Sequence, residues 1–350
     1  MAKPRGQGTR NRGGGGGPID ARIRELSWGY RPALIILTAN RLRLFDALSD
    51  RAMTSPGLAR KLGLDQRALG IVLDALTALD LLLKRKNHYR CRTEVKNLLV
   101  TGGAHYQGNI LDHRFNVLER WMDLPRVVER GGPAKLMRSK RSPREWREFI
   151  LGMENVAKES IDPFLLAMNL KGRNRLIDLG GGPGTYTIAL CRRYKRLEAV
   201  LFDIPETVSI ARKQIREAGL DGRIKTETGN YLTCDIGRGF DAALLSNIIH
   251  SLSGKEFLML ARKVFRALDE GGIIAIREFR LDENRTNPIG SALFAVNMLV
   301  STEGGNCYTP SEIKKTLGRA GFVKLRTATV TPQANLYLGT KITKDNRSKT

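Results

Sequence analysis

Apolar and polar positions follow two different periods along the chain, and the change of period falls near residue 172. Before it, apolar residues recur every three or four positions, which predicts helices. From Arg175 onward, short apolar runs alternate with helical segments. Such alternation predicts a mostly parallel sheet with helices on both faces. We therefore expect an α/β fold in the second half and a mainly helical first half.

The second half holds seven short apolar runs that we interpret as strands. A sheet of this class binds its ligands beyond the carboxyl ends of its strands. The expected strands are residues 175–179, 197–203, 224–229, 240–246, 272–279, 323–330 and 335–340, with helices after Pro183 and at 206–218, 255–267 and 311–320.

The first half begins with helical periodicity over residues 18–48. Next, Ser55 is the expected N-cap of a short helix with Pro56 at its first position, and Asp65 caps a helix over 66–79. Two short strands, 81–84 and 88–91, follow. Two helices and a hairpin predict a winged helix-turn-helix. Because its second helix is mostly apolar, we expect it to pack, for example against a second subunit, and not to read DNA bases.

Residues 95–172 predict further helices, one over 106–124 and one over 146–170, joined by a basic linker over 127–143. Arg/Gly-rich residues 1–17 cannot bury apolar surface, so we expect disorder there. The expected organisation is a tail (1–17), a winged-helix dimerisation domain (18–100), linking and pocket-lining helices (101–172), a catalytic domain (173–341) and a polar tail (342–350).

Composition narrows the class of protein. No apolar run is long enough to span a bilayer, and the first residues lack a signal pattern, so we expect a cytoplasmic protein. The four cysteines are scattered, which argues against a disulfide framework and against a metal site. Lys and Arg exceed Asp and Glu to give a net charge of +24. A basic chain leaves nucleic acid open as a partner, which would bind with steep salt dependence.

The most informative stretch is the turn after the first strand of the second half. Asp178 ends that strand, and Gly180, Gly182 and Gly184 follow at alternate positions. Glycines let the backbone turn tightly and let a ligand approach main-chain N–H groups. The turn alone is shared by several nucleotide-binding sheets.

Neighbouring strand ends indicate which nucleotide this turn binds. Asp203 ends the second strand, where its carboxylate can accept both hydroxyls of a ribose. Asn230 and Tyr231 follow the third strand and suit the edge and face of a purine. The chain lacks a Gly-x-x-x-x-Gly-Lys phosphate loop and has no Lys or Arg at the turn. These features favour an adenosine without phosphates, which points to S-adenosylmethionine.

A family resemblance supports this interpretation. The chain from about 20 to 341 resembles the small-molecule O-methyltransferases that include plant caffeate-type and hydroxyindole enzymes and their bacterial relatives. The resemblance implies a seven-stranded Rossmann-like methyltransferase sheet, homodimerisation through the N-terminal domain, and S-adenosyl-L-homocysteine as product. The stretches that carry it are Leu179-Gly-Gly-Gly-Pro-Gly, Phe202-Asp-Ile-Pro-Glu, Gly229-Asn-Tyr, Ser246-Asn-Ile-Ile-His250, Leu268-Asp-Glu-Gly-Gly, Asn297-Met298 and Gly304-Gly-Asn.

The resemblance also assigns site residues. It makes His250 the general base, and Glu278, at the end of the next core strand, could accept from the other imidazole nitrogen and fix the tautomer. No metal is expected. The implied cofactor-binding residues are Asp178, Gly180, Gly182, Asp203, Asn230, Tyr231 and Ser246, and the expected acceptor pocket holds Met153, Phe294, Met298 and Thr302.

The chain departs from the family pattern at three positions. Ser251 stands where the family usually has Asp after the histidine, and Asn230 stands where it has an acid that faces the adenine. A second acid that flanks the histidine in the plant enzymes falls near Cys307 in this chain. The leading hypothesis is methyl transfer to a hydroxyl of an aromatic or polyketide-like small molecule in secondary metabolism. The alternatives are nucleic-acid methylation by the basic N-terminal half, methylation of C, N or S, and a family member that does not methylate.

Overall fold

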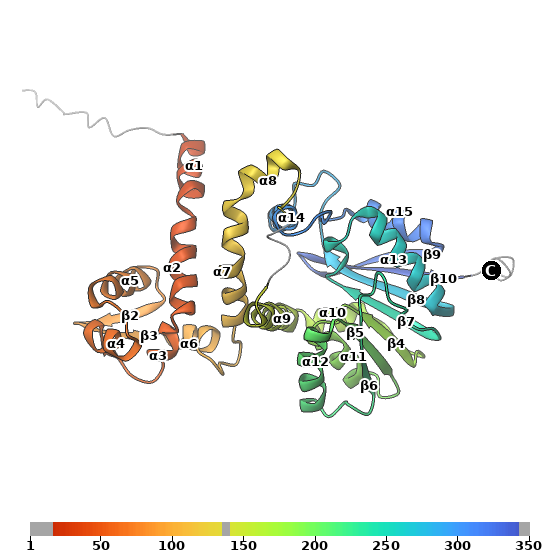
Figure 1. The fold of residues 1–350 in the computed structure, drawn as a ribbon, viewed down its shortest axis with the longest axis horizontal. Coiled ribbons are helices and arrows are strands. Elements are labelled where there is room, and N and C mark those ends of the chain that lie inside the picture. The colour runs from red at the N-terminus through yellow and green to blue at the C-terminus, as the bar shows by residue number, and fades with distance from the viewer. Residues whose placement is uncertain (1–16, 135–140, 343–350) are drawn as a thin grey trace, which may run out of the picture. The chain divides into compact units, whose positions relative to one another are not determined.

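The computed structural model describes residues 17–134 and 141–342 (Figure 1). Most of the expected tails at 1–17 and 342–350, and part of the expected linker at 127–143, lie outside these residues. The chain divides into two compact units, residues 1–103 and 104–350.

The first unit packs helices against a small three-stranded sheet. The central strand β3 pairs antiparallel with both β1 and β2. Its elements are α1 (Pro18–Trp28), α2 (Tyr30–Arg41), α3 (Leu44–Ala47), β1 (Met53–Thr54), α4 (Ser55–Leu62), α5 (Gln66–Ala78), β2 (Leu82–Arg85), β3 (His88–Cys91) and α6 (Thr93–Leu99).

Two N-caps in this unit test the predicted helix starts. Asp65 caps α5 as predicted, with its side chain accepting from the Ala68 N–H. The predicted cap Ser55 is wrong, because the Thr54 side chain accepts from the Gly57 N–H and the helix begins one residue earlier. The Ser55 hydroxyl instead donates to the carbonyl of Gln66 at 3.0 Å. Ser55 therefore connects α4 to α5, a tertiary role that spacing alone does not indicate.

Within the described residues, the second unit begins with a series of α-helices. They are α7 (Gly108–Met122), α8 (Leu124–Arg130), α9 (Pro143–Lys158) and α10 (Ile161–Ala167). The expected linker is thus helical as far as Arg130. The single helix expected over 146–170 is wrong, because it ends at Lys158 and a second helix begins at Ile161. Pro163 has no N–H to donate to the carbonyl of Glu159, so it fits the first turn of α10 but disfavours one continuous helix through this region.

The rest of this unit is the predicted α/β domain. Strand boundaries match the sequence pattern within a few residues, except that β8 begins earlier. Its elements are β4 (Arg175–Leu179), α11 (Thr185–Arg193), β5 (Glu198–Asp203), α12 (Pro205–Glu217), β6 (Ile224–Thr228), β7 (Phe240–Ser246), the 3-10 helix η2 (Ile249–Ser251), α13 (Gly254–Ala267), β8 (Leu268–Phe279), α14 (Ile289–Ser301), α15 (Pro310–Ala320), β9 (Phe322–Thr331) and β10 (Ala334–Lys341).

The strands form one seven-stranded sheet, which confirms that prediction, and their order is β6-β5-β4-β7-β8-β10-β9. The first five strands in this order pair in parallel, and β10 pairs antiparallel with both β8 and β9. After β6 the chain returns to the other side of β4, so the direction of strand addition reverses between β4 and β7. Ligands of such sheets bind at this reversal, beyond the carboxyl ends of the strands.

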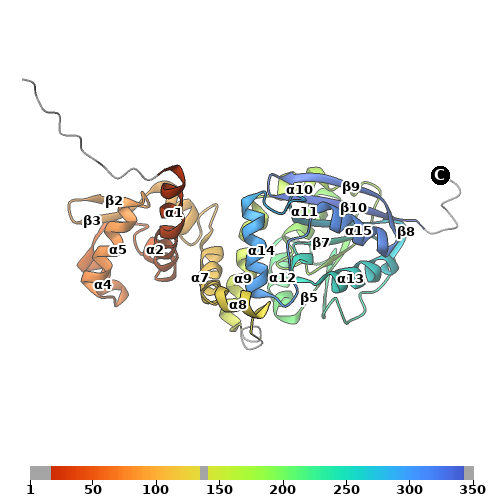
Figure 2. The ribbon, with the colours of Figure 1, turned by 90° about the horizontal axis from the view of Figure 1, so that it is seen from above.

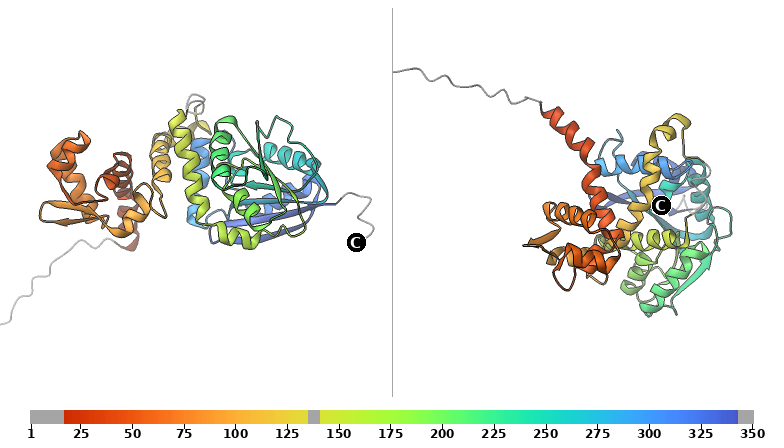
Figure 3. Two further views of the ribbon diagram at one scale, coloured as in Figure 1. Left: turned by 90° about the horizontal axis from the view of Figure 1, so that it is seen from below. Right: turned by 60° about the vertical axis from the view of Figure 1, so that its left-hand side comes forward.

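Two hydrophobic cores fill the space between the sheet and its helices. One lies between the sheet and α13 and α15, around Phe257 and Tyr337. The other lies between the sheet and α10, α11 and α12, around Phe164 and Leu201. Figures 2 and 3 show the sheet between these two helical layers. The three-layer arrangement leaves the strand ends to carry polar residues.

Candidate active site

The glycine turn after β4 has a backbone that favours glycine. Gly180, Gly182 and Gly184 have φ values of 65°, 58° and 84°, in the left-handed region. A Cβ on Gly180 would lie 2.7 Å from a methyl of Ile248, whereas nothing lies within 4 Å of the same position on Gly182. Gly180 therefore packs against the protein, and Gly182 faces open space in which a ligand can approach.

Asp203, at the end of β5, stabilises this turn through hydrogen bonds. Its Oδ2 accepts from the Gly182 N–H at 2.9 Å and its Oδ1 from the Ile204 N–H at 2.7 Å. Burial raises the pKa of the Asp203 carboxyl, although these hydrogen bonds act to lower it. The structure thus brings together two of the predicted cofactor residues.

Two further predicted cofactor residues follow β6. The Tyr231 ring is partly buried beside the turn, 3.5 Å from where a Cβ on Gly180 would lie. Asn230 is exposed, and its side-chain oxygen accepts from the Leu232 N–H at 2.9 Å. Ser246 ends β7, the strand next to β4. Asn230 and Tyr231 thus follow a strand on one side of the reversal, and Ser246 ends the first strand on the other side.

Asp178 lies beneath the turn, in the core. It is 2% exposed, and its Oδ2 accepts a hydrogen bond from the Thr187 hydroxyl. Among the described residues its Oδ1 has no hydrogen-bond partner. Burial raises the pKa of this carboxyl to about 7. A buried carboxylate oxygen without a partner suits a positively charged ligand group.

His250 lies on η2, directly after β7, and is paired with Glu278 at the end of β8. The imidazole Nδ1 lies 2.9 Å from Oε1 and 3.1 Å from Oε2 of the carboxylate. Glu278 is fully buried and also accepts from the main-chain N–H groups of His250 and Phe279. A carboxylate at Nδ1 holds the proton on that nitrogen, which leaves Nε2 as a proton acceptor.

The backbone of His250 is held from a second side. Its carbonyl accepts from the Asn306 N–H at 2.8 Å. A Cβ on Gly305 would lie 2.5 Å from the same carbonyl oxygen, so only glycine permits this approach. The loop before α15 therefore packs directly against the residue that carries the imidazole.

Aromatic rings surround the exposed side of the imidazole. The Phe294 ring, from α14, meets it edge-on with centroids 4.8 Å apart. Phe279 lies 5.9 Å from the imidazole and stacks on Phe294 at 4.0 Å. Sequence reasoning included Phe294 and missed Phe279, although Phe279 directly follows Glu278. These rings form an apolar wall beside the candidate base.

The other predicted acceptor residues differ in their location and in their contacts. Met298 is buried one turn after Phe294, and Met153 lies on α9. The Thr302 hydroxyl donates to the Met298 carbonyl at 2.7 Å and accepts from the Gly305 N–H at 2.9 Å. Both contacts close the end of α14, so the hydroxyl is already used within the chain.

The two departures beside the base have structural roles. The Ser251 hydroxyl donates to the Ile248 carbonyl at 2.7 Å. Cys307 is buried, and burial together with the charge of Glu278 raises the pKa of its thiol to about 12. A thiol with this pKa stays neutral near pH 7, so it cannot replace an ionised acid.

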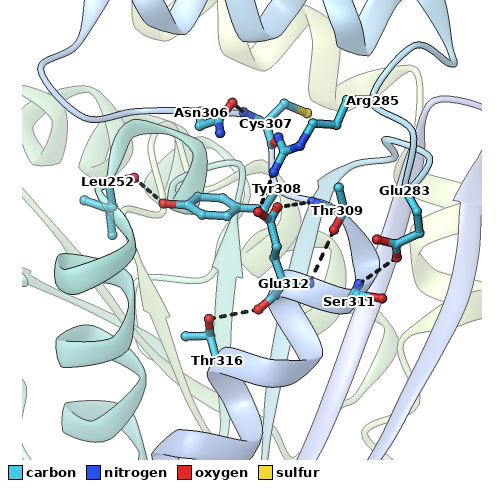
Figure 4. Close-up of polar contacts among 10 residues, drawn as sticks. All are labelled: Leu252, Glu283, Arg285, Asn306, Cys307, Tyr308, Thr309, Ser311, Glu312 and Thr316. Atoms are coloured by element: carbon cyan, nitrogen blue, oxygen red, sulfur yellow. Dashed lines mark hydrogen bonds and ion pairs between the residues drawn. The ribbon is translucent and has the colours of Figure 1, made fainter.

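Figure 4 shows how the loop of Cys307 is fixed at the start of α15. The Tyr308 hydroxyl donates to the Leu252 carbonyl at 2.6 Å, and the Arg285 guanidinium donates to the Cys307 carbonyl at 3.2 Å. Thr309 and Glu312 form a capping box at the helix N-terminus. The loop is therefore tied to η2, to the β8–α14 connection and to α15.

Two absences complete the description of the site. Within residues 17–134 and 141–342, no group of three or more His, Cys, Asp or Glu side chains is placed to bind a metal ion. Over the same residues, no helix has the length and apolar character needed to cross a bilayer.

Comparison with known proteins places this chain in a family. The profile described as "O-methyltransferase domain" matches residues 122–323, and the profile described as "O-methyltransferase dimerisation domain" matches residues 25–102. The chain is 29% identical over 324 residues to a 3-hydroxy-5-methyl-1-naphthoate 3-O-methyltransferase of Streptomyces sahachiroi, covering 89% of this chain and 92% of that protein.

Two further relatives extend the comparison. An L-tyrosine C(3)-methyltransferase of Streptomyces lavendulae is 26% identical, with 88% of each chain covered. Human N-acetylserotonin methyltransferase, solved in complex with S-adenosylmethionine, has the same fold, with a TM-score of 0.85 at 23% identity over 95% of this chain and all of that one. The chain belongs to the family of S-adenosylmethionine-dependent O-methyltransferases.

Proposed function

We propose that this enzyme transfers a methyl group from S-adenosylmethionine to a hydroxyl oxygen of an aromatic or polyketide-like small molecule, as a step of secondary metabolism. The observation that carries the proposal is the His250–Glu278 pair, at 2.9 Å, beside the Phe294 ring. It combines a proton acceptor with an apolar wall suited to a flat ring.

The residues of the glycine turn fit the cofactor. Gly182 offers open space and a left-handed backbone, and Asp203 beside it suits the ribose hydroxyls. The unpartnered Oδ1 of Asp178 suits a positively charged group. Tyr231 and Asn230 would contact the adenine, and Ser246 lies at the end of the adjacent strand. When bound, this cofactor supplies an electrophilic methyl group and leaves as S-adenosyl-L-homocysteine.

His250 would act as the general base. Glu278 keeps the Nδ1 proton in place, so Nε2 can take the proton of the acceptor hydroxyl as the oxygen becomes nucleophilic. The imidazole becomes positively charged in this step, and the buried carboxylate stabilises that charge. The fixed backbone of His250 keeps Nε2 in one position while the acceptor binds.

The relatives support an aromatic acceptor without naming it. One relative is a 3-hydroxy-5-methyl-1-naphthoate 3-O-methyltransferase, and another is an L-tyrosine C(3)-methyltransferase. The second activity keeps carbon as an alternative acceptor atom. Identification of the bond formed in the product, by nuclear magnetic resonance, separates the two.

The test of the base is the variant His250→Ala, assayed with labelled cofactor and a panel of hydroxylated aromatics. We expect kcat to fall by about two orders of magnitude or more, because general base catalysis contributes about 10²–10⁴-fold. Affinity for S-adenosylhomocysteine, measured by calorimetry, should stay within about two-fold. His105→Ala, at an exposed position, is the matched control. Unchanged turnover in His250→Ala would show that the base is another group.

We also propose that the chain forms a homodimer through its first unit. The match to a dimerisation domain supports this, and so does an apolar surface on α1, where Ile19, Ile23 and Trp28 are 70%, 59% and 61% exposed. A surface of this kind is costly to leave in water. Sedimentation of the whole chain should give twice the monomer mass, and a monomer at micromolar concentration would refute the proposal.

A further inference from the structure

Arg120 and Arg141 are both partly buried near the packing of α7 against α9, and they are close enough for the charge of Arg120 to lower the pKa of Arg141. Arg120 lies near the end of α7, and Arg141 lies just before α9. His113 is seven residues before Arg120, on the same face of α7. The Arg141 guanidinium lies 4.2 Å from the Phe149 ring centroid, and the His113 ring lies 5.0 Å from that ring. Arg141, Phe149 and His113 thus form a continuous row.

Neither arginine has a carboxylate in direct contact among the described residues. The acidic side chains nearby are already engaged. Glu148 pairs with Arg144 at 2.8 Å and accepts from Asn116 at 2.7 Å. Glu145 attracts both arginines but is occupied with Ser142 in the capping box of α9. The sequence of residues 135–140, Lys-Leu-Met-Arg-Ser-Lys, contains no acid.

The electrostatics of the patch around these two arginines favour the binding of an anion. Burial lowers the pKa of Arg120, and burial and the charge of Arg120 lower that of Arg141 to about 10. Burial and then the charges of Arg141, Arg120 and Arg114 lower the pKa of His113 to about 4, although Glu148 acts to raise it. The imidazole is therefore neutral near pH 7 and retains one N–H donor. Unpaired, partly buried positive charge is unfavourable, and an anion placed there would relieve the cost.

A short chain of contacts connects this patch to the candidate base. Trp121, next to Arg120, donates from its ring N–H to the Asn297 side-chain oxygen on α14 at 3.0 Å. Phe294, on the same helix, meets His250. The helix α14 is in contact with α7, and Figure 2 shows these two helices side by side. The patch is therefore connected through α7 to the helix whose Phe294 contacts His250.

We propose that Arg120 and Arg141 bind a carboxylate on the methyl acceptor, at the opposite end from the hydroxyl that faces His250. The identification of this ligand as the acceptor rests on the proposed function. Guanidinium groups suit carboxylates because they can donate two parallel hydrogen bonds. The Phe149 ring under Arg141 restricts the guanidinium plane. The substrate class is then a hydroxylated aromatic acid.

The test measures binding and not turnover. Calorimetry in the presence of S-adenosylhomocysteine compares three aromatic carboxylates, benzoate, 1-naphthoate and 3-hydroxy-1-naphthoate, each with its carboxamide. We expect at least one carboxylate to bind about ten-fold or more tightly than its amide, the range of a charged hydrogen bond. Arg120→Gln and Arg141→Gln should each reduce this preference to about three-fold or less, with little change for the amide.

Matched controls distinguish a specific loss of the carboxylate preference from a loss of folding. Arg147→Gln changes an exposed arginine on α9 and should keep the full carboxylate preference. All variants should bind S-adenosylhomocysteine as the parent does. If no carboxylate binds more tightly than its amide, including the case where neither binds, the proposal is overturned. It is also overturned if both arginine variants weaken the acid and the amide equally, since the patch would then be structural or paired with another subunit.

The outcome can be distinguished from a failure of the proposed function. A carboxylate preference that depends on Arg120 and Arg141, in a protein that methylates no hydroxyl, would retain the anion site and remove the proposed reaction. Methyl transfer to neutral phenols alone, with no preference for acids, would retain the proposed reaction and remove the anion site.

Discussion

The proposed cofactor side and the proposed acceptor side of this enzyme are built in different ways. The cofactor side uses the main chain of one glycine turn and the first polar residues after three neighbouring strands, so its members are close in the sheet. The acceptor side collects side chains from α7, α9, η2 and α14, which are up to about 180 residues apart. Local sequence therefore encodes the first region, whereas tertiary packing assembles the second.

The two regions also differ in the substitutions that they can tolerate. The cofactor turn depends on left-handed backbone at three positions, where other residues are strained. The acceptor wall depends on ring contacts and charges, which substitutions can exchange without disturbing the backbone. A family with this division can keep one cofactor and change its acceptors.

The strongest test of this comparison is Asp203→Ala. The variant removes an acceptor for two main-chain N–H groups, including that of Gly182, and the proposed partner of the ribose. We expect the Kd for S-adenosylhomocysteine to rise by about 100-fold, since charge-assisted hydrogen bonds contribute about 1.5–3 kcal/mol each. Calorimetry measures this directly.

The control for that variant is Asp221→Ala, at an exposed turn position. Its Kd should match that of the parent. If Asp203→Ala binds the cofactor product normally, the two regions do not divide as described.

A smaller effect is expected for Glu278→Gln on the acceptor side. The amide keeps a hydrogen-bond acceptor for His250 but removes the charge that stabilises the imidazolium. We expect kcat to fall by about 10–100-fold, with unchanged affinity for S-adenosylhomocysteine. Single-turnover kinetics and calorimetry measure the two quantities separately.

Glu227→Gln, exposed on β6, serves as the matched variant and should leave both quantities unchanged. If Glu278→Gln weakens cofactor binding and leaves kcat normal, this carboxylate acts on the cofactor side and not on the acceptor side.

Much of this fold follows from sequence pattern alone. The seven strands have the expected alternation, and Asp65 caps α5 because a short acceptor side chain satisfies free N–H groups at any helix start. The pairing of His250 with Glu278 also follows, since both residues lie at the carboxyl ends of adjacent strands.

Other features depend on contacts that no local pattern records. The break between α9 and α10 places Ser160 in the core, where its hydroxyl contacts Tyr186 at 2.8 Å and Arg277 at 3.0 Å. Arg141 lies in a sequence that reads as a basic linker, and only the packing of Phe149 against it reveals a partly buried charge. In both cases the informative neighbour is remote in sequence or on another turn.

The clamp on the main chain of His250 has a consequence for selectivity. Glu278 binds its N–H, Asn306 binds its carbonyl, and the close approach of Gly305 leaves the backbone no room to shift. The proposed base thus loses almost no conformational entropy when an acceptor arrives. In the proposed mechanism an acceptor must instead adopt the one orientation that meets Nε2, so a rigid reference point, and not the intrinsic acidity of the hydroxyls, would determine which position of a polyhydroxylated ring is methylated.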